Sequence, residues 1–446
     1  MKKKVRLSVC IICLLLFNAC AALPGQENRT GDVSFKQDTL GLTPDFSYEV
    51  KEQKPNILID REGYLPDEKK TAFFIGNDIV GEFYIKEETT GETVYQGVIS
   101  GTNASIGEEA VSTGDFSAFL EEGNFVIYHE KLGYSYPFTI GKNVYDNVLI
   151  RLANLLKTYP YTQVSESAYT LSNVMMTKEI YKDFEPDRVF IQNAMRRLLE
   201  AQDEKTGAFP LTYPKQADAE TEPEISLSAT AETAGVLAQY VFNFKDTDPE
   251  FCAECLRAAQ KAFAYIEKYR GNISTDSWYF AATQLYRATG GYRYRTAIAE
   301  YDSISEASRT ISEYDYTILA DIAYLSTSYT TDFKRCNAIM ERYLDRAQEI
   351  SLNSLRENFY VLKNADTMSE KELLEDMMIL GIVNYVLSGR EYAGIQQNYI
   401  HYFFGINAQR RNLLTETGDD GTQETLQDDI TKVSEFIFVM GNVLGR

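Results

Sequence analysis

The side chains with the most versatile chemistry are scarce in this sequence. It holds two histidines, His129 and His401, and six cysteines among 446 residues. So few imidazoles make a histidine-rich metal site or a serine–histidine–aspartate triad a poor expectation. Cys252 and Cys255 have the C-x-x-C spacing of redox and zinc sites, but no second pair supplies the remaining zinc ligands. We therefore expect both to be small buried residues on a helix face, and we expect no metal and no cofactor.

Carboxylates and tyrosines, in contrast, are abundant. Asp and Glu number 65 against 44 Lys and Arg, which gives a formal net charge of −21, and there are 31 Tyr and 24 Phe. The acidity argues against nucleic acid as a partner, because a phosphate backbone must be met by a basic surface. It also argues against docking on anionic lipid through charge. With 44% hydrophobic residues the chain is globular, and its length is typical of two or three domains.

The secondary structure that the sequence predicts changes from β-strands to helices near residue 142. Over residues 55–142, short β-rich runs are separated by glycine-bearing turns, which predicts an antiparallel β-sandwich. Thr90-Gly91-Glu92 is a plausible hairpin turn between two of these runs. The runs themselves are Ile57–Ile59, Thr71–Ile75, Glu82–Ile85, Thr93–Val98, Phe125–Tyr128 and Tyr136–Ile140.

Over residues 143–446, apolar residues recur at helical spacing. We count about twelve such segments, a number that suits an α/α toroid of inner and outer helices. A solenoid would also fit, but we find no fixed sequence period. In the segment from Asp187 to Gln202 the apolar stripe holds Val189, Ile191, Ala194, Met195, Leu198 and Leu199.

Short motifs follow one another in a fixed order through both parts of the chain. The β part has Ile59-Asp60-Arg61-Glu62-Gly63-Tyr64-Leu65-Pro66 and then Gly114-Asp115-Phe116-Ser117. The helical part has Leu198-Leu199-Glu200-Ala201-Gln202, the stretch from Trp278 to Gly290, and Tyr402-Phe403-Phe404-Gly405-Ile406-Asn407. The ordered set resembles glycoside hydrolase family 9, the cellulase type, with its N-terminal immunoglobulin-like domain. The resemblance implies an immunoglobulin-like β-sandwich followed by an (α/α)6 toroid.

The resemblance also implies hydrolysis of β-1,4-glucosidic bonds with inversion, which needs an acid and a base roughly 6.5–9.5 Å apart. Glu435 stands at the position of the family's general acid. Its neighbours Val433 and Phe436 would give it an apolar setting and so raise its pKa, as a general acid requires. A Glu on the helix surface is the alternative interpretation. Asp428 and Asp429 are alternative carboxylates or an N-cap.

Two further family motifs are absent, so the resemblance is to a divergent member. The base segment Gly-Gly-Trp-x-Asp-Ala-Gly-Asp would fall at residues 159–166, which read Tyr-Pro-Tyr-Thr-Gln-Val-Ser-Glu. Glu166 is the only nearby carboxylate, and we interpret it as an ordinary Glu at a helix start. The family's His-His-Arg would follow Asn407, where the chain has Ala-Gln-Arg-Arg. The catalytic site that the resemblance implies is therefore incomplete.

Sugars bind to flat aromatic faces with accompanying hydrogen bonds. Tyr161, Tyr213 and Trp278 lie near predicted loops or helix starts and are candidate substrate contacts. Arg410 is a candidate contact to ligand hydroxyls. Core packing is the alternative for each aromatic residue, and an exposed helix end is the alternative for Arg410.

The N-terminus has the features of an export signal. Basic residues precede an apolar run over residues 7–17, which is too short to span a bilayer. Ala19-Cys20 then resembles a bacterial lipobox, which implies removal of residues 1–19 and lipidation of Cys20. Ordinary signal-peptide cleavage after the Ala-x-Ala motif Ala19-Cys20-Ala21, giving a soluble secreted protein, is the alternative. Residues 20–54, with scattered glycine and proline, are expected to form a flexible linker.

These observations leave two hypotheses for function. The first is a glycoside hydrolase of the family 9 type, held by its lipid on the outer face of a bacterial cell membrane and acting on or binding β-1,4-glucan. The second is a catalytically inactive lipoprotein that binds a glycan or serves polysaccharide assembly, which would explain the missing segments. In both, the partner is an oligo- or polysaccharide, and the membrane is contacted through the lipid anchor only.

Overall fold

A computed structural model describes residues 54–106, 108–180, 184, 186–214, 224–354, 359, 361, 368–418 and 425–444. The predicted signal peptide, Cys20 and all of the predicted linker before Lys54 lie outside these residues. Among the helices that are described, none is long and apolar enough to cross a membrane.

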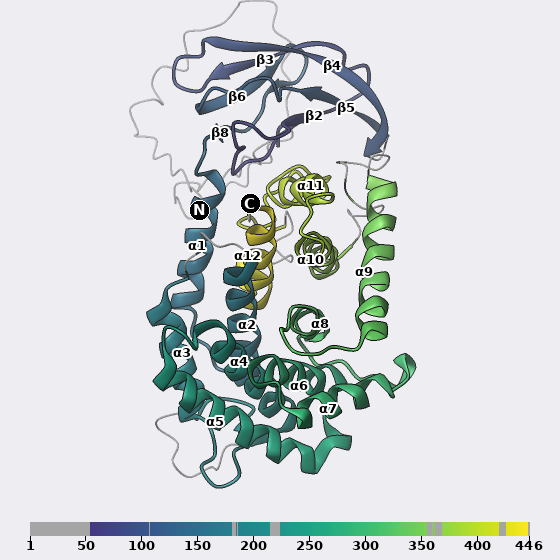
Figure 1. The fold of residues 1–446 in the computed structure, drawn as a ribbon. Helices are drawn as coiled ribbons and strands as arrows, with labels where there is room; N and C mark the ends of the chain where they lie inside the picture. Colours follow the sequence, from purple (N-terminus) through teal and green to yellow (C-terminus); the bar gives the residue numbers. More distant parts are fainter. Residues whose placement is uncertain are drawn as a thin grey trace, which may run out of the picture. The chain divides into compact units, whose positions relative to one another are not determined.

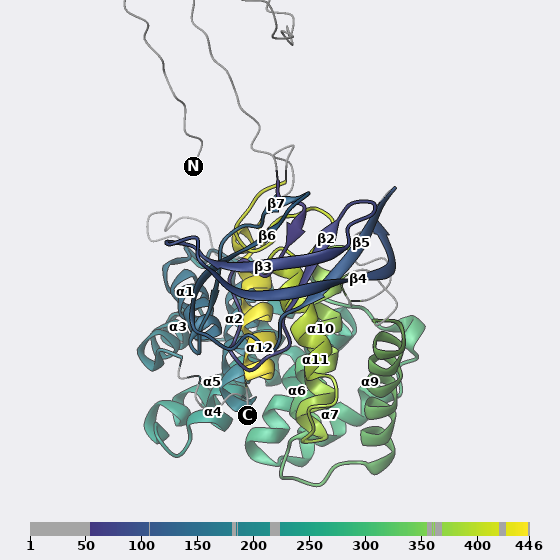
Figure 2. The ribbon, with the colours of Figure 1, turned by 90° about the horizontal axis from the view of Figure 1, so that it is seen from above.

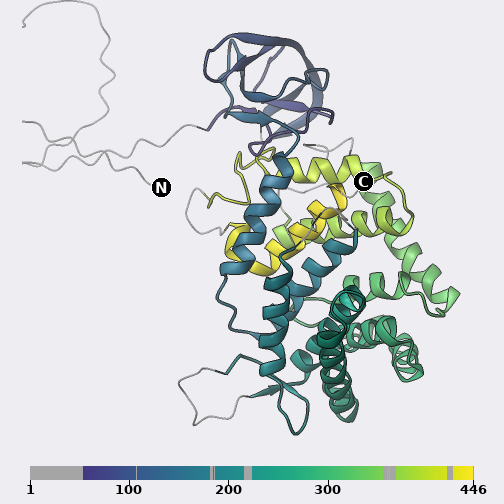
Figure 3. The ribbon, with the colours of Figure 1, turned by 60° about the vertical axis from the view of Figure 1, so that its left-hand side comes forward.

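The first part of the described chain is a curled antiparallel sheet (Figures 1 and 3). Its order is β1-β2-β5-β4-β3-β6-β7, with β8 paired to β6. The predicted hairpin turn is confirmed between β3 and β4, where Gly91 adopts φ +72°. The strands are β1 (Ile57–Leu58), β2 (Thr71–Ile75), β3 (Gly81–Glu87), β4 (Thr93–Ile106), β5 (Glu109–Asp115), β6 (Gly123–His129), β7 (Gly133–Tyr134) and β8 (Phe138–Ile140).

Strand β2 joins two cores. Phe74 packs in the core of the sandwich, whereas Phe73 and Ile75 point to the opposite face and belong to the core of the helical part. Because successive strand residues face opposite sides, this double burial explains why the run Thr-Ala-Phe-Phe-Ile lacks polar alternation. The sandwich is thus attached to the helices by apolar packing.

The remaining chain forms a ring of helices, which confirms the predicted (α/α)6 toroid. Helix-to-helix contacts run α2–α4–α6–α8–α10–α12 and back to α2, and each odd-numbered helix packs against this inner ring. Helix α9, for example, lies on the outer side of α10 (Figures 1 and 2). The helices are α1 (Val144–Thr158), α2 (Val164–Ile180), α3 (Arg188–Glu200), α4 (Leu227–Phe244), α5 (Pro249–Ile266), α6 (Thr275–Thr289), α7 (Tyr292–Asp302), α8 (Thr317–Leu325), α9 (Phe333–Ser354), α10 (Glu370–Val386), α11 (Ala393–Phe403) and α12 (Ile430–Leu444).

Inner and outer helices differ as their positions require. Inner helix α4 is buried nearly all round, whereas outer helix α3 buries only Ile191, Met195 and Leu198. Val189, which the sequence places in the apolar stripe of α3, is 64% exposed. At about 100° per residue, Val189 lies on the side of α3 opposite Ile191, Met195 and Leu198, so it faces solvent and does not belong to the buried stripe.

The two cysteines of α5 are buried and unpaired, as expected from the sequence. Burial raises the pKa of the Cys252 thiol to about 11, and burial also raises that of Cys255. Both thiols therefore stay protonated at neutral pH, and neither has the low pKa of a redox-active cysteine.

Gly63, in the opening motif of the sandwich, has a backbone that only glycine tolerates. Its φ is +118°, and a Cβ atom there would lie 2.2 Å from the carbonyl oxygen of Thr139. We expect Gly63→Ala to lower the free energy of unfolding by about 2 kcal/mol or more, since both strain and a backbone clash arise. Urea denaturation measures this. Gly91→Ala is the matched control, because its φ is +72° with no atom within 4 Å, so equal losses in the two variants would contradict the packing argument.

Candidate functional site

Glu435 lies on α12 and turns inward, so the helix-surface interpretation does not hold. The residue is 6% exposed. Its Oε1 accepts a 2.7 Å hydrogen bond from the hydroxyl of Tyr169 on α2, and its Oε2 is buried with no hydrogen-bond partner among the described residues. Burial raises the pKa of Glu435 to about 7. The carboxyl is therefore largely protonated below neutral pH, the state in which a general acid works.

The contact between α2 and α12 is fixed at two levels. One helical turn beyond the Tyr169–Glu435 bond, the side-chain amide of Asn173 donates to Ser434 Oγ at 3.1 Å. Ser434 in turn donates to the carbonyl of Thr431 at 2.7 Å. Because both bonds join the same two helices, the position of Glu435 relative to α2 is set by rigid elements and not by a loop.

Two more tyrosines enclose Tyr169. Tyr314 stacks on it with ring centroids 5.5 Å apart, and Tyr316 meets it edge-on at 5.2 Å. Both come from the segment that leads into α8, and Tyr316 is the residue that precedes this helix. Below, the carboxyl–tyrosine cluster means Glu166, Glu232, Glu435, Tyr169, Tyr314 and Tyr316.

Glu232, on α4, is a second buried carboxyl in this cluster. It is 1% exposed, and its Oε1 accepts a 2.8 Å hydrogen bond from Ser277 on α6. Burial raises the pKa of Glu232 to about 7. We did not single it out from the sequence. The available signal was one acidic residue inside Ser-Ala-Thr-Ala-Glu-Thr-Ala-Gly, a stretch too rich in small residues to be a solvated face.

Glu166 stands in the first turn of α2, as predicted for a helix-start residue. It is half-buried, and its Oε1 accepts a 2.9 Å hydrogen bond from the hydroxyl of Tyr159. Burial raises the pKa of Glu166, and the negative charge of Asp429 contributes in the same direction. The same Asp429 charge also raises the pKa of Glu435. Both carboxyls therefore lie near the start of α12.

Two of the predicted sugar contacts gather at this edge. The rings of Tyr159 and Tyr161 lie 5.0 Å apart, and the backbone N–H of Tyr213 donates to the carbonyl of Thr162 at 3.0 Å. The charge of Glu166 raises the pKa of both Tyr161 and Tyr213, after the larger effect of burial. Tyr161 and Tyr213 thus lie near the connection that leads into α2, and Tyr159 is the tyrosine that bonds to Glu166.

The structure gives the other two predicted contacts different roles. Trp278 is 4% exposed, with Phe263 stacked on its ring at 5.0 Å and the guanidinium of Arg270 5.1 Å from its ring centre. It offers no free face to a sugar, because α6 buries it against α5. Arg410 bonds to Asn56 and lies 3.3 Å from a carboxylate oxygen of Glu109. Its charge therefore serves contact with the sandwich.

The two aspartates before α12 act as caps. Asp429 Oδ1 accepts from the backbone N–H and the hydroxyl of Thr431 at 3.0 and 2.6 Å. Asp428 accepts from the backbone and hydroxyl of Thr425 at 2.8 and 2.9 Å. Of the two sequence interpretations, the N-cap matches what these side chains do.

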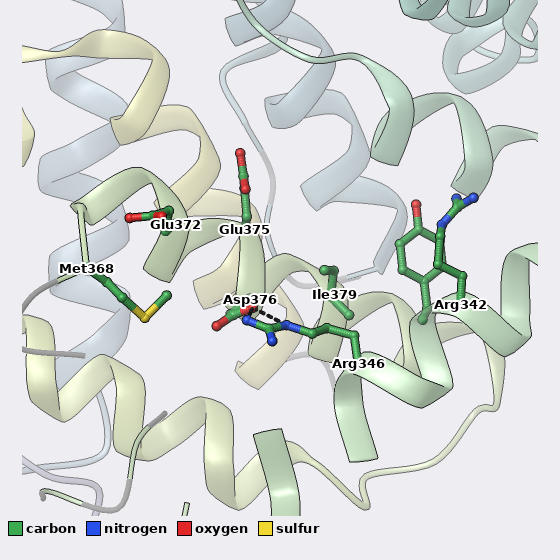
Figure 4. Close-up of a pocket in the computed structure, with 8 residues that line it drawn as sticks. Arg342, Arg346, Met368, Glu372, Glu375, Asp376 and Ile379 are labelled. Atoms are coloured by element: carbon green, nitrogen blue, oxygen red, sulfur yellow. Dashed lines mark hydrogen bonds and ion pairs between the residues drawn. The ribbon is translucent and has the colours of Figure 1, made fainter. Parts of the chain in front are cut away.

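A cavity of about 400 Å³ lies between α9 and α10. Figure 4 shows Arg346 joined to Asp376 there, while Glu375 points away from this pair. Arg342 is likewise paired, with Asp321 at 2.5 Å. Burial is the main cause of the raised pKa of Glu435, and the negative charge of Glu375 contributes in the same direction. Within the described ranges, no group of three or more His, Cys, Asp or Glu residues is placed to hold a metal ion.

Comparison with known proteins now decides the family. The model described as glycosyl hydrolase family 9 matches residues 175–429, and that described as the cellulase N-terminal ig-like domain matches residues 52–133. The chain belongs to glycosyl hydrolase family 9. It is a divergent member that lacks the usual base segment and His-His-Arg. Both Glu166 and Glu435 fall just outside the range that the family 9 model matches.

Relatives support the same family and fold. Endoglucanase 19 of Arabidopsis thaliana is 22% identical over 232 residues, which cover 47% of this chain and 35% of that protein. The alignment thus spans about a third of the relative's length. A metagenome-derived family 9 endoglucanase and a Bacteroides ovatus family 9 protein each superpose with a TM-score of 0.71 at 15% identity, covering 87% of this chain and 99% of theirs. A mutant endoglucanase of Alicyclobacillus acidocaldarius gives 0.69 at 14% identity, covering 88% of this chain and 100% of its own.

The buried carboxyls predict a pH dependence of stability. Since the pKa of Glu232 is about 7 instead of 4.5, the folded state binds more protons than the unfolded state between these values, and stability falls as pH rises through that window. We expect Glu232→Gln to be more stable than wild type at pH 8 by about 2 kcal/mol, and equal to it near pH 4. Urea denaturation at a series of pH values measures the difference. Parallel stability curves for the two proteins would contradict the raised pKa.

Proposed function

We propose that this protein hydrolyses β-linked glucan, with Glu435 as the general acid. In this reaction the protonated carboxyl of Glu435 gives its proton to the oxygen that leaves the anomeric carbon. Tyr159 and Tyr161, in the connection that precedes α2, contribute flat faces for the sugar units. The observation that carries the proposal is the buried Oε2 of Glu435, which has no described partner although its pKa is near 7.

The loss of stability caused by burying Oε2 of Glu435 without a hydrogen bond supports a functional role for this residue. A buried polar atom without a hydrogen bond destabilises a folded protein by about 1–3 kcal/mol. The resemblance of the sequence around Glu435 to the family's acid segment supports the same role, in a chain that belongs to the family. The endoglucanase names of several relatives make a β-1,4-glucan the substrate to test first.

A second function, glycan binding without cleavage, is favoured by a separate observation. The five residues between α1 and α2, 159–163, leave no room for the family's base segment, and Glu435 is 6% exposed. A binding protein needs neither a base nor an accessible acid. Tyr159 and Tyr161 would serve such a protein equally well.

A single panel separates these functions. The purified protein is incubated with cellohexaose, mixed-linkage β-glucan, xyloglucan and xylan, and new reducing ends are measured beside calorimetric binding of cellohexaose. Release of reducing ends from a β-glucan supports the hydrolase. Binding without release supports the second function, and neither binding nor release from any of the glycans would contradict both.

We also propose that the protein is exported and held on the outer face of a bacterial membrane by a lipid on Cys20. The proposal rests on the basic and apolar start of the chain and on the Ala19-Cys20 pair. Labelling of the expressed protein with a radioactive fatty acid tests it. Label should enter wild type and be lost in Cys20→Ala, and an unlabelled wild type would favour a soluble secreted protein.

A further inference from the structure

The first turn of α6 carries a fully buried carboxylate, Asp276. Its Oδ1 accepts the backbone N–H of Ser312 at 2.9 Å. Its Oδ2 accepts the hydroxyl of Ser312 at 2.5 Å and the backbone N–H of Tyr316 at 3.0 Å. All three donors belong to residues 310–316, the segment that leads into the neighbouring inner helix α8. One carboxylate of α6 therefore holds the 310–316 segment through three hydrogen bonds.

The residue before Asp276 holds the start of the same segment. The backbone N–H and the hydroxyl of Thr275 both donate to the carbonyl of Thr310, at 2.9 and 2.8 Å. The hydroxyl of Thr275 also accepts the backbone N–H of Thr310 at 2.9 Å. Two successive residues of α6 thus fix the 310–316 segment at its beginning, in its middle and at its end.

These bonds differ from those of an ordinary acidic residue at a helix start. Such a residue stabilises its own helix through the helix dipole. Asp276 is instead buried, where an ionised carboxylate is tolerated only when donors surround it. The donors come from the 310–316 segment and not from the first turn of α6. The carboxylate therefore serves the position of that segment.

The 310–316 segment needs such support because its backbone is strained. Asp315 has φ +33°, in the left-handed region, and a non-glycine residue held in this region costs about 1–3 kcal/mol. Such a conformation persists only where surrounding contacts impose it. Asp315 lies between Tyr314 and Tyr316, so the strained bend sets how these two rings are presented.

The two rings enclose the tyrosine that bonds to the acid. Tyr314 stacks on Tyr169 with an interplanar angle of 25°, and Tyr316 meets it at 87°. The hydroxyl of Tyr169 donates to Glu435 at 2.7 Å. A continuous series of contacts therefore runs from Asp276 through this pair of rings to Glu435.

We propose that Asp276 is a positioning residue for Glu435, an inference that rests on the proposed hydrolase function. Asp276 acts through the 310–316 segment, which keeps Tyr169 enclosed and its hydroxyl on Oε1 of Glu435. Oε2 is then the oxygen that gives its proton to the leaving group. Release of the segment would free the ring of Tyr169 and let water reach the carboxyl.

Entry of water has a definite effect on the acid. Burial is the largest influence on the pKa of Glu435 and raises it to about 7, whereas the bond from Tyr169 has a smaller, opposite effect. Hydration of the carboxyl therefore lowers its pKa even if the bond from Tyr169 is lost as well. The protonated acid would then disappear at a lower pH than in wild type.

The first test is the kinetics of Asp276→Ala. We expect kcat for cellohexaose to fall at least about tenfold while KM changes less than about threefold, since a fully buried residue does not contact sugar. The alkaline limb of the pH–rate profile should move from about pH 7 to about pH 6 or below. A smaller amount of folded protein would lower the rate equally at every pH and leave the limb in place.

A second readout does not depend on turnover. Carbon NMR of protein labelled at the glutamate Cδ follows the ionisation of Glu435, and Glu435→Gln identifies its signal. The titration near pH 7 in wild type should move to lower pH in Asp276→Ala. Asp276→Asn keeps an acceptor for Ser312 but offers none to the N–H of Tyr316, so it should show a smaller shift even if the alanine variant folds poorly.

The matched control is Asp203→Ala. Asp203 also accepts a backbone N–H and a hydroxyl, both from Thr206 at 2.6 Å, but in the turn that follows α3. Its removal should leave the titration of Glu435 in place. An unmoved titration in folded Asp276 variants, or the same shift in Asp203→Ala, would overturn the positioning role. An inactive wild type would overturn the proposed hydrolysis, and the titration would still decide whether Asp276 positions the carboxyl.

Discussion

Replacing Glu435 by glutamine is expected to slow glucan hydrolysis by about a hundredfold or more, because a positioned acid contributes about 10²–10⁴-fold. Glutamine can still accept the hydrogen bond from Tyr169, but it has no acidic proton for the leaving oxygen. Binding of cellohexaose should therefore change less than about threefold. Initial rates of reducing-end release and calorimetric titration measure the two quantities.

The pH profile gives an independent check on the same residue. Since the pKa of Glu435 is about 7, the protonated acid is lost as pH rises through this value, and the rate of wild type should fall above it. Glu313→Gln is the control for removal of one carboxyl, because Glu313 is exposed. A Glu435→Gln variant that keeps more than a tenth of the wild-type rate would show that another group supplies the proton.

Replacing Asp60 by alanine is expected to lower the free energy of unfolding by about 3 kcal/mol or more, the largest stability effect we predict, because each buried polar group left without a hydrogen bond costs about 1–3 kcal/mol. Asp60 is fully buried in the motif that opens the sandwich. Its Oδ1 accepts the backbone N–H groups of Glu62 and Gly63, both at 2.8 Å. Its Oδ2 lies 2.6 Å from Nδ1 of His401 on α11. Alanine would leave two backbone donors and one imidazole nitrogen without these partners.

Burial sets the charge state of this pair. Burial raises the pKa of Asp60 well above its usual range, and burial lowers that of His401. A hydrogen bond is therefore favoured over two separate charges, and asparagine should replace Asp60 with a much smaller loss. Chemical denaturation compares the variants, with Asp67→Ala at an exposed position expected within about 0.5 kcal/mol of wild type. An Asp60→Ala protein within 1 kcal/mol of wild type would contradict a structural role for the pair.

The β-rich part and the helical part of the chain can be predicted from the sequence, because both depend on local patterns. Alternating short runs and helical periodicity need no knowledge of distant contacts. Strand β5 is not predicted from the sequence, because Glu-Ala-Val-Ser-Thr-Gly-Asp has few β-favouring residues. It forms because it pairs with β2 on one side and β4 on the other. Asp60 shows a second limit, because its bond to His401 spans 341 positions of sequence.

The candidate site was predictable only in part. Glu435 could be selected because the residues around it resemble a known acid position, whereas its partner Tyr169 lies 266 positions away and carries no motif. Tyr161 and Tyr213 were selected as residues near loops, and they do lie near the connection that leads into α2. Trp278 was selected by the same reasoning and is enclosed in the core, because position near a helix start does not reveal which face an inner helix presents.

The most direct test of the account is the configuration of the first product. Proton NMR of cellohexaose during incubation with the purified protein distinguishes the α anomer, which inversion produces, from the β anomer before the two equilibrate. We predict that wild type releases the α anomer and that Glu435→Gln releases almost none over the same time. Binding of cellohexaose without release of any product by wild type would contradict the hydrolase, and early β anomer would contradict inversion of the anomeric carbon.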